Sequence, residues 1–121
     1  MITVLIVDDD ISIHKMLDPV LIHNGYAVCS AYTGEEGLAM TKEKKPDIVL
    51  LDLLMPGMTG IQVLERMNKE GLLKATRVIV LTIITDEKTK DQVMILGATD
   101  YLIKSDLELS EIVKKVSSYL E

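Results

Sequence analysis

The sequence predicts an α/β fold, a doubly wound parallel sheet of five strands in which each strand is followed by a helix. Short runs rich in Val, Ile and Leu recur along the 121 residues, and most of them end in a polar residue. Continuous apolar runs of this length are typical of strands that are buried on both faces of a parallel sheet. Helical patterns lie between the runs, and such alternation implies parallel strands joined by right-handed crossovers.

The expected strands are short and largely apolar. Four clear strands cover residues 3–9, 47–52, 77–82 and 100–104, and a weaker one covers residues 26–30. Because the chain has no Trp and no Phe, the core has to be built from aliphatic side chains, with seven methionines available to fill irregular gaps.

The expected helices begin and end at recognisable signals. They cover roughly residues 12–24, 33–45, 61–70 and 86–96, and a last helix runs from residue 105 to the end of the chain. Thr33 and Ser105 each precede a glutamate by three residues, which is the capping-box spacing of a helix N-terminus. Pro19 lies inside the first helix, where we expect a kink or a break.

Length and charge limit the function classes. A chain of 121 residues fits one domain, residues 1–121, and we find neither a linker nor a second domain in it. The formal net charge of −6 argues against direct binding of nucleic acid, because phosphate contacts need clustered Lys and Arg. We expect neither a signal peptide nor a membrane span, because the first apolar run has no basic segment before it and no run is long enough.

The cysteine and the histidines do not suggest a metal or redox site. Cys29 lies in an apolar run and is expected to be a small core residue, which fits a reducing, cytoplasmic setting. His14 and His23 have no ligand partners at useful spacing, so we expect them in surface or helix-packing roles.

Polar side chains follow the expected strands where each strand ends. They are Asp8, Asp9, Asp52, Thr82 and Lys104. In the flavodoxin-like strand order 2-1-3-4-5 these ends meet at one edge of the sheet, where open α/β sheets bind ligands. Strands about 5 Å apart would place the acidic pair and Thr82 one strand from Asp52. Lys104 would lie two strands away, within reach of its long side chain.

Three carboxylates against one lysine leave an excess of negative charge at this edge. Like charges at such range raise carboxylate pKa values unless a cation intervenes. Oxygen ligands suit a hard divalent cation, and we expect Mg²⁺, with Mn²⁺ as an alternative. Phosphoryl transfer uses a nucleophile, a metal, a cationic group and a hydroxyl around the transferred group. A carboxylate is a suitable nucleophile for this transfer, because it can form an aspartyl phosphate.

Four motifs carry a resemblance to a known family. They are VLIVDDD, IVLLDLLMPGMTG, VIVLT and GATDYLIK, spread over nearly the whole chain. In this order and at this spacing they resemble the receiver domain of bacterial response regulators, the phospho-accepting half of two-component systems. The resemblance implies a phosphoacceptor, not an enzyme, that assists its own phosphorylation and dephosphorylation. A histidine kinase would be the donor. The surface of the fourth helix, fifth strand and fifth helix would then meet an output protein or effector domain, or form a homodimer.

The resemblance implies a metal-binding role for four matching residues. Asp52 matches the phosphoacceptor, which also binds the metal. Asp9 matches a direct metal ligand, and Asp8 matches the partner that acts mainly through a metal-bound water. The backbone carbonyl of Leu54 matches a further ligand.

Three more residues match positions that contact the phosphoryl group or switch with it. Lys104 matches the lysine that pairs with phosphoryl oxygens, and Thr82 matches the hydroxyl that turns toward them. Tyr101 matches the aromatic side chain that moves inward as that hydroxyl moves.

The chain departs from the family pattern at several of these positions. Ser105 stands where a proline usually follows the lysine, often after a cis peptide, so we expect a trans bond and a rearranged loop. Ile83 stands where a small residue is usual, so it should narrow the path to the site and could hinder Tyr101. Leu54 and Ile84 offer no hydrogen bond to an attacking water, which favours a long-lived phosphoryl group, and with Ile83 they are the residues expected to tune its lifetime.

Two other functions stay open. A pseudo-receiver would keep the fold for protein binding without being phosphorylated, and the unusual Ile83 and Ser105 are compatible with it. A haloacid-dehalogenase-like phosphatase shares the motif Asp8-x-Asp10 after a strand. That family needs another acidic pair after the lysine, and its members usually have a cap domain and a longer chain. This function would also give no role to Asp52.

Overall fold

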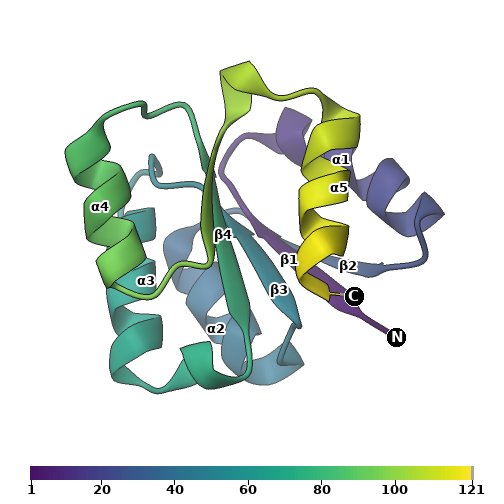
Figure 1. Cartoon of the computed structure of the whole chain (residues 1–121). Helices are drawn as coiled ribbons and strands as arrows, with labels where there is room; N and C mark the ends of the chain where they lie inside the picture. Colours follow the sequence, from purple (N-terminus) through teal and green to yellow (C-terminus); the bar gives the residue numbers. More distant parts are fainter. Residues whose placement is uncertain (121) are drawn as a thin grey trace.

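The computed structural model describes residues 1–120 and has the expected architecture. Five parallel strands form one sheet in the order β2-β1-β3-β4-β5, which confirms the predicted fold class and strand order (Figure 1). The strands are β1 (Thr3–Val7), β2 (Ala27–Ala31), β3 (Ile48–Leu51), β4 (Arg77–Thr82) and β5 (Asp100–Ile103).

Helices cover both faces of the sheet. They are α1 (Ile11–His23), α2 (Gly34–Lys44), α3 (Gly60–Lys69), α4 (Glu87–Ile95) and α5 (Leu109–Leu120), with short 3-10 helices at Leu72–Lys74 and Lys104–Asp106. Helices α1 and α5 lie on one face, and α2, α3 and α4 lie on the other (Figure 1). Among residues 1–120, the helices are all too short or too polar to cross a membrane.

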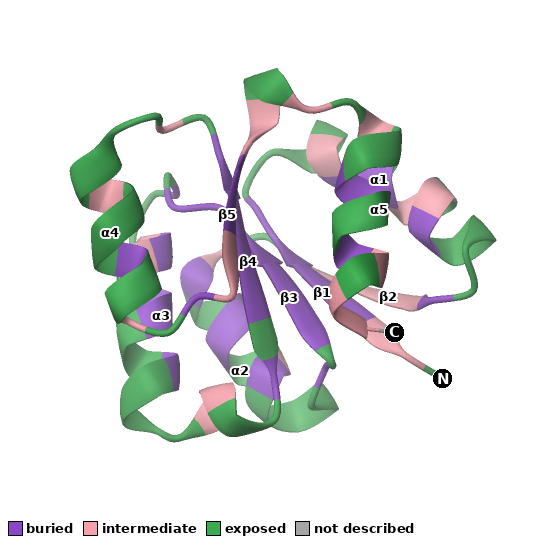
Figure 2. Ribbon diagram, in the orientation of Figure 1, coloured by how far each residue is buried: buried purple, intermediate pink, exposed green. Residues whose placement is uncertain are grey.

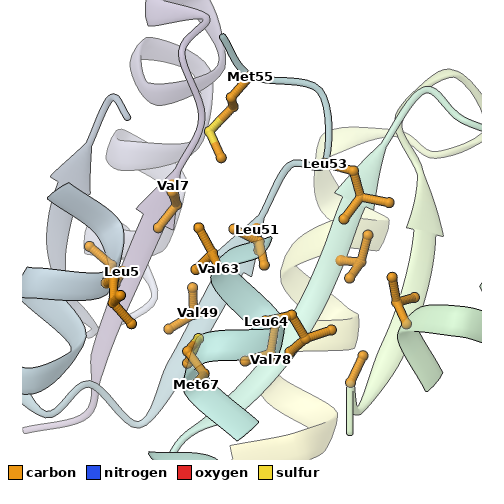
Figure 3. Packing of buried hydrophobic residues seen from close by; sticks show 14 of the residues in the cluster. Leu5, Val7, Val49, Leu51, Leu53, Met55, Val63, Leu64, Met67 and Val78 are labelled. Atoms are coloured by element: carbon orange, nitrogen blue, oxygen red, sulfur yellow. The ribbon is translucent and has the colours of Figure 1, made fainter. Parts of the chain in front are cut away.

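Two aliphatic cores result from the alternation of side chains along the strands. Leu5 and Val7 of β1 face the core shared with α2, α3 and α4, and Val4 and Ile6 face the core shared with α1 and α5. The central strands are buried almost throughout (Figure 2). On the α3 side, the side chains of β1, β3 and β4 meet those of α3, and Met55 extends this core toward the end of β3 (Figure 3). The buried sheet therefore gives its carboxyl edge a rigid base.

Helix α1 starts at an aspartate cap and runs through Pro19 without a break. The Asp10 side chain accepts the Ser12 N–H at 3.0 Å. Of the kink or break expected at Pro19, the break is wrong, because α1 is continuous over this residue. Leu17 and Leu21, on either side of Pro19, are buried against the sheet and hold the helix in place. Pro19 itself is on the exposed side, where solvent can satisfy the carbonyl that loses its partner.

The last helix begins later than the capping-box spacing at Ser105 predicted. Residues Lys104–Asp106 form a 3-10 turn, Leu107 is extended, and α5 starts at Leu109. The expected start at Ser105 is therefore wrong, because Leu107 turns away from a helix to pack beside the α1–α5 core. The Glu108 N–H donates to the Glu111 carboxylate at 3.1 Å instead. The Lys104–Ser105 peptide is trans, as expected.

Helices α2 and α3 begin at threonine caps. Thr33 accepts the Glu36 N–H at 3.1 Å, which confirms the predicted start of α2. Thr59 forms a full capping box with Gln62 at the start of α3. The next residue, Gly60, packs against the backbone at the end of β3, and its N–H donates to the Leu53 carbonyl at 3.0 Å. The start of α3 is thus fixed against the segment that carries Asp52.

Substitution of Gly60→Ala should destabilise the fold strongly. A β-carbon at this position would overlap the Asp52 carbonyl oxygen and lie 2.7 Å from Leu53 Cα. We expect the free energy of unfolding in urea to fall by about 2–4 kcal/mol, because backbone atoms cannot move aside cheaply. The control is Gly71→Ala, where no atom lies within 4 Å and only the positive φ of 73° opposes a side chain. That change should cost about 1 kcal/mol. Equal losses in the two variants would contradict the close approach at Gly60.

Candidate functional site

The carboxyl edge of the sheet brings Asp8, Asp52 and Lys104 into direct contact. Asp8 directly follows β1, Asp52 follows β3 and Lys104 follows β5. Strands β1 and β3 are neighbours, whereas β5 is separated from β3 by β4. The Lys104 side chain crosses this distance, and its Nζ lies 2.7 Å from Asp8 Oδ2 and 3.2 Å from Asp52 Oδ2. The predicted meeting of these three side chains is what the structure has.

Asp52 is held at the end of a buried strand by the backbone around it. Its N–H donates to the Val7 carbonyl at 3.0 Å, which continues the pairing of β1 and β3 by one residue. Its Oδ1 accepts the N–H of Leu53 at 2.8 Å and that of Leu54 at 3.4 Å. The residue is only 6% exposed, so these hydrogen bonds and Lys104 compensate a carboxylate that burial alone would disfavour.

Asp8 is more deeply buried and is fixed on both oxygens. Its Oδ1 accepts the Asp10 N–H at 2.9 Å and its Oδ2 accepts from Lys104. Burial raises the pKa of Asp8 above its ordinary 3.8, and the negative charge of Asp52 adds to the rise. The hydrogen bonds from Lys104 and from the Asp10 N–H oppose this shift without cancelling it. The ionised form of Asp8 therefore disfavours the folded state.

The charge of Lys104 is stabilised by the two carboxylates it touches. Burial of the ammonium lowers the pKa of Lys104, but the hydrogen bond to Asp8 and the charges of Asp52 and Asp8 outweigh burial and raise it. The lysine is therefore positively charged at neutral pH. One ammonium nevertheless faces three carboxylates, because Asp9 lies beside Asp8 and Asp52.

Asp8, Asp9 and Asp52 have the arrangement of a divalent cation site. One carboxylate oxygen from each lies within 4.8 Å of the others. Asp9 is exposed, whereas Asp8 and Asp52 are buried, so the site opens to solvent on the Asp9 side. All three donors are hard oxygens, which fits Mg²⁺ better than a softer metal.

Thr82 lies at this edge but does not contact Asp52 through a hydrogen bond in this structure. It is fully buried at the end of β4, and its hydroxyl accepts the Ile84 N–H at 3.5 Å. The Leu54 side chain is 51% exposed beside the cluster. The role predicted for the Leu54 carbonyl stays a prediction.

Tyr101 is packed inside the protein. It is 8% exposed, and its hydroxyl donates to the Ile84 carbonyl at 2.7 Å. Burial raises the pKa of Tyr101, and the charges of Asp86, Asp52 and Glu87 add to it. The Ile83 side chain is 60% exposed, so it leaves the buried position of Tyr101 free. Whether Ile83 hinders a movement of Tyr101 stays a prediction.

His14 is a site neighbour that the sequence reasoning missed. It is 2% exposed, its Nε2 lies 2.8 Å from the Asp8 carbonyl oxygen, and its Nδ1 lies 3.0 Å from Ser30 Oγ. Of the surface or helix-packing roles expected for this histidine, the surface role is wrong, and His14 is a buried packing residue of α1. The helical period gave a usable signal, because His14 precedes the buried Leu17 and Leu21 by three and seven residues.

Comparison with known proteins identifies the family. The family model of the response regulator receiver domain matches residues 4–117. The chain belongs to the response regulator receiver family.

The relatives of this receiver domain differ in length: one matches over almost its whole length, and others match over about half of theirs. Protein PilH of Pseudomonas aeruginosa is 33% identical over 120 residues, which cover 99% of this chain and 98% of PilH. A probable transcriptional regulator, ycf27 of Porphyridium aerugineum, is 36% identical over 115 residues, which cover 93% of this chain but only 47% of that protein. The chain thus spans about half the length of several relatives that it matches.

A solved receiver structure has the same fold. The CheX–CheY–BeF3–Mg²⁺ complex from Borrelia burgdorferi contains a chain with a TM-score of 0.89 and 30% identity, covering 99% of this chain and 90% of that one. The protein is therefore a receiver domain of two-component signalling, and the family consists of signalling modules, not classical enzymes. The alternative of a phosphatase is not favoured.

Substitution of Asp8→Asn should stabilise the metal-free receiver domain at pH 7. The pKa of Asp8 is raised on folding, so its ionised form disfavours the folded state at neutral pH. We expect the free energy of unfolding, and with it Tm, to rise relative to the parent protein. The gain over the parent protein should shrink as the pH falls through the folded-state pKa toward 3.8, because the parent Asp8 then becomes protonated.

The matched control for this prediction is Asp10→Asn. It removes an adjacent carboxylate that is exposed and that serves as a helix cap, a role asparagine fills equally well. The pKa of Asp10 is lowered by its hydrogen bonds with Ser12, so this change should leave stability equal or slightly reduced. Thermal unfolding in chelator from pH 4 to pH 8 would measure both. An Asp8→Asn variant that is less stable than Asp10→Asn at pH 7 would contradict the prediction.

Proposed function

We propose that this receiver domain takes a phosphoryl group from a histidine kinase onto Asp52 in a reaction that depends on Mg²⁺. The observation that carries the proposal is the contact of Lys104 with both Asp8 and Asp52, beside a third carboxylate from Asp9. The strand-end carboxylate, the acidic pair and the lysine are the set that metal-assisted phosphoryl transfer to an aspartate requires.

The two oxygens of the Asp52 carboxylate have different hydrogen-bond partners, because Oδ2 accepts from Lys104 and Oδ1 does not. This difference suggests that they act differently in phosphoryl transfer. Oδ1 accepts two backbone N–H groups, so it is held in one orientation. In the transfer, an Asp52 oxygen attacks phosphorus, the bond from phosphorus to the kinase imidazole breaks, and the imidazole nitrogen keeps the electron pair. Lys104 would exchange its carboxylate partners for a phosphoryl oxygen. It would thereby neutralise charge that the transferred group brings to an already acidic edge.

Asp8, Asp9 and Asp52, with the Leu54 carbonyl, would hold the Mg²⁺ ion. The bound cation would neutralise the acidic edge and polarise a phosphoryl oxygen. The likeness to a receiver captured with BeF3 and Mg²⁺ supports this assignment. Mn²⁺ has similar ligand preferences and would serve as a substitute.

The output step would use Thr82, Tyr101 and the face of α4, β5 and α5. Tyr101 lies on β5 and its hydroxyl bonds the β4–α4 loop at Ile84, so it joins the edge to that face. Movement of the Thr82 hydroxyl toward a phosphoryl group would release the Ile84 N–H and change the same loop. This change in the loop would allow a partner to bind, or would promote a homodimer on phosphorylation. We place this signalling in the cytoplasm, and we assign the domain no turnover of a separate substrate.

Incubation with phosphoramidate or acetyl phosphate should add one phosphoryl group to the protein when Mg²⁺ is present. Intact mass would detect the adduct, and chelator or Asp52→Asn should abolish it, because each removes one required group. An Asp106→Asn variant controls for loss of an exposed carboxylate near the site. No adduct from the parent protein with either donor, and none from a histidine kinase, would favour the pseudo-receiver.

The phosphoryl group on Asp52 should be long-lived, with a decay measured in minutes or longer. Leu54 and Ile84 lie beside the site and provide no polar group to orient an attacking water. Leu54→Asn should shorten the lifetime several-fold, because its amide can hold that water. Ile95→Asn is a matched control, since Ile95 is an exposed apolar residue at the far end of α4. Decay within seconds in the parent protein, or an equal effect at Ile95, would contradict this role.

A further inference from the structure

The buried imidazole of His14 joins three segments beneath the acidic edge. It comes from the first turns of α1, its Nε2 lies 2.8 Å from the Asp8 carbonyl oxygen, and its Nδ1 lies 3.0 Å from Ser30 Oγ at the end of β2. The Tyr32 ring packs on it at a centroid distance of 4.4 Å and an angle of 42°. A polar side chain that is 2% exposed and bonded at both nitrogens has one fixed orientation.

The direction of these hydrogen bonds follows from their partners. A carbonyl oxygen can only accept, so Nε2 carries the hydrogen and donates it to Asp8. In the neutral ring Nδ1 then accepts, and the Ser30 hydroxyl is the donor. Ser30 therefore orients the ring so that its N–H points at the β1–α1 turn.

The Asp8 carbonyl, which accepts the hydrogen bond from His14, lies in the chain between two candidate cation ligands. The Asp8 carbonyl belongs to the peptide plane that joins Asp8 to Asp9, so its direction also fixes where the Asp9 backbone starts. On the other side, the Asp8 N–H donates to the Ala31 carbonyl at 3.1 Å. The backbone of Asp8 is thus clamped from β2 and from α1. Without the second clamp, the Asp8–Asp9 peptide could rotate and the two carboxylates would converge less often.

We propose that His14 is a positioning residue for the divalent cation, acting through the Asp8–Asp9 peptide, with Ser30 orienting its ring. The inference rests on the proposed cation site of Asp8, Asp9 and Asp52. It assigns to His14 a part of the Mg²⁺ affinity, not of the phosphoryl chemistry. Groups that orient metal ligands without touching the metal typically contribute about 10- to 100-fold in affinity.

The test is Mg²⁺ affinity by calorimetry in His14→Leu, His14→Gln and Ser30→Ala. Leucine fills the space and leaves the Asp8 carbonyl without its donor, so we expect affinity to fall about tenfold or more. Glutamine keeps an N–H that can reach the Asp8 carbonyl, so it should recover most of the loss. Ser30→Ala keeps the donor and loses its orientation, so it should cost a few-fold.

The rate of phosphorylation by phosphoramidate separates positioning from damage to the chemistry. In His14→Leu the Mg²⁺ concentration for half-maximal rate should rise with the dissociation constant, while the rate at saturating Mg²⁺ stays within about twofold of the parent, because only ligand positioning is lost. Leu17→Val is the stability control, because Leu17 is buried on the same face of α1. It should lower Tm and leave Mg²⁺ affinity unchanged.

Three outcomes would overturn the inference. Parental Mg²⁺ affinity in His14→Leu, or in His14→Gln and Ser30→Ala together if the leucine variant does not fold, would remove His14 from the cation site. Loss of affinity in Leu17→Val equal to that in His14→Leu would show a purely structural role. If the parent protein itself binds no Mg²⁺, the proposed function falls first and the inference falls with it.

Discussion

The ammonium of Lys104 lies between the carboxylates of Asp8 and Asp52, and the arrangement of the whole sheet edge depends on this contact. Asp8 and Asp52 are nearly buried, so each would be costly without a cation close by. Lys104 supplies one positive charge to both, and Asp9 adds a third negative charge at the solvent side. The fold thus keeps an excess of negative charge at this edge. A divalent cation would neutralise the charge that Lys104 leaves uncompensated.

The architecture behind this edge was predictable because few tertiary details decide it. Doubly buried parallel strands need continuous apolar runs, and each run has to end where the chain returns to solvent. The position of Asp52 after the apolar run of β3, and of Lys104 after β5, therefore predicted their common edge. The strand order turned that edge into a site, because it sets β3 between β1 and β4. Local signals were sufficient for the cap at Thr33 as well.

What the sequence could not predict depends on contacts between segments that are distant in the chain. Pro19 stays inside an unbroken helix because its neighbours are buried against the sheet, which local propensity does not record. Leu107 moves the start of α5 by packing against the core that α1 and α5 share with the sheet, although the spacing at Ser105 suited a cap. His14 became visible as a polar link only when β2 supplied Ser30 and the β1–α1 turn supplied the Asp8 carbonyl. In each case tertiary packing decided between local alternatives.

The same edge combines a rigid backbone with unfavourable charge, and this combination suits a switch. Backbone N–H groups hold the Asp52 carboxylate, and hydrogen bonds at the N–H and the carbonyl of Asp8 hold the Asp8 backbone. The two carboxylates are thus kept close together. Lys104 offsets the repulsion among the three carboxylates only in part, and a divalent cation would bind more tightly because its ligands are already in place. The Tyr101 hydroxyl bonds the loop before α4 at the Ile84 carbonyl, so a change in charge at Asp52 would have a short physical route to the proposed output face. If the carboxylates could move apart and reduce their repulsion, the site would bind the cation more weakly. Less free energy would then be available to drive a conformational change.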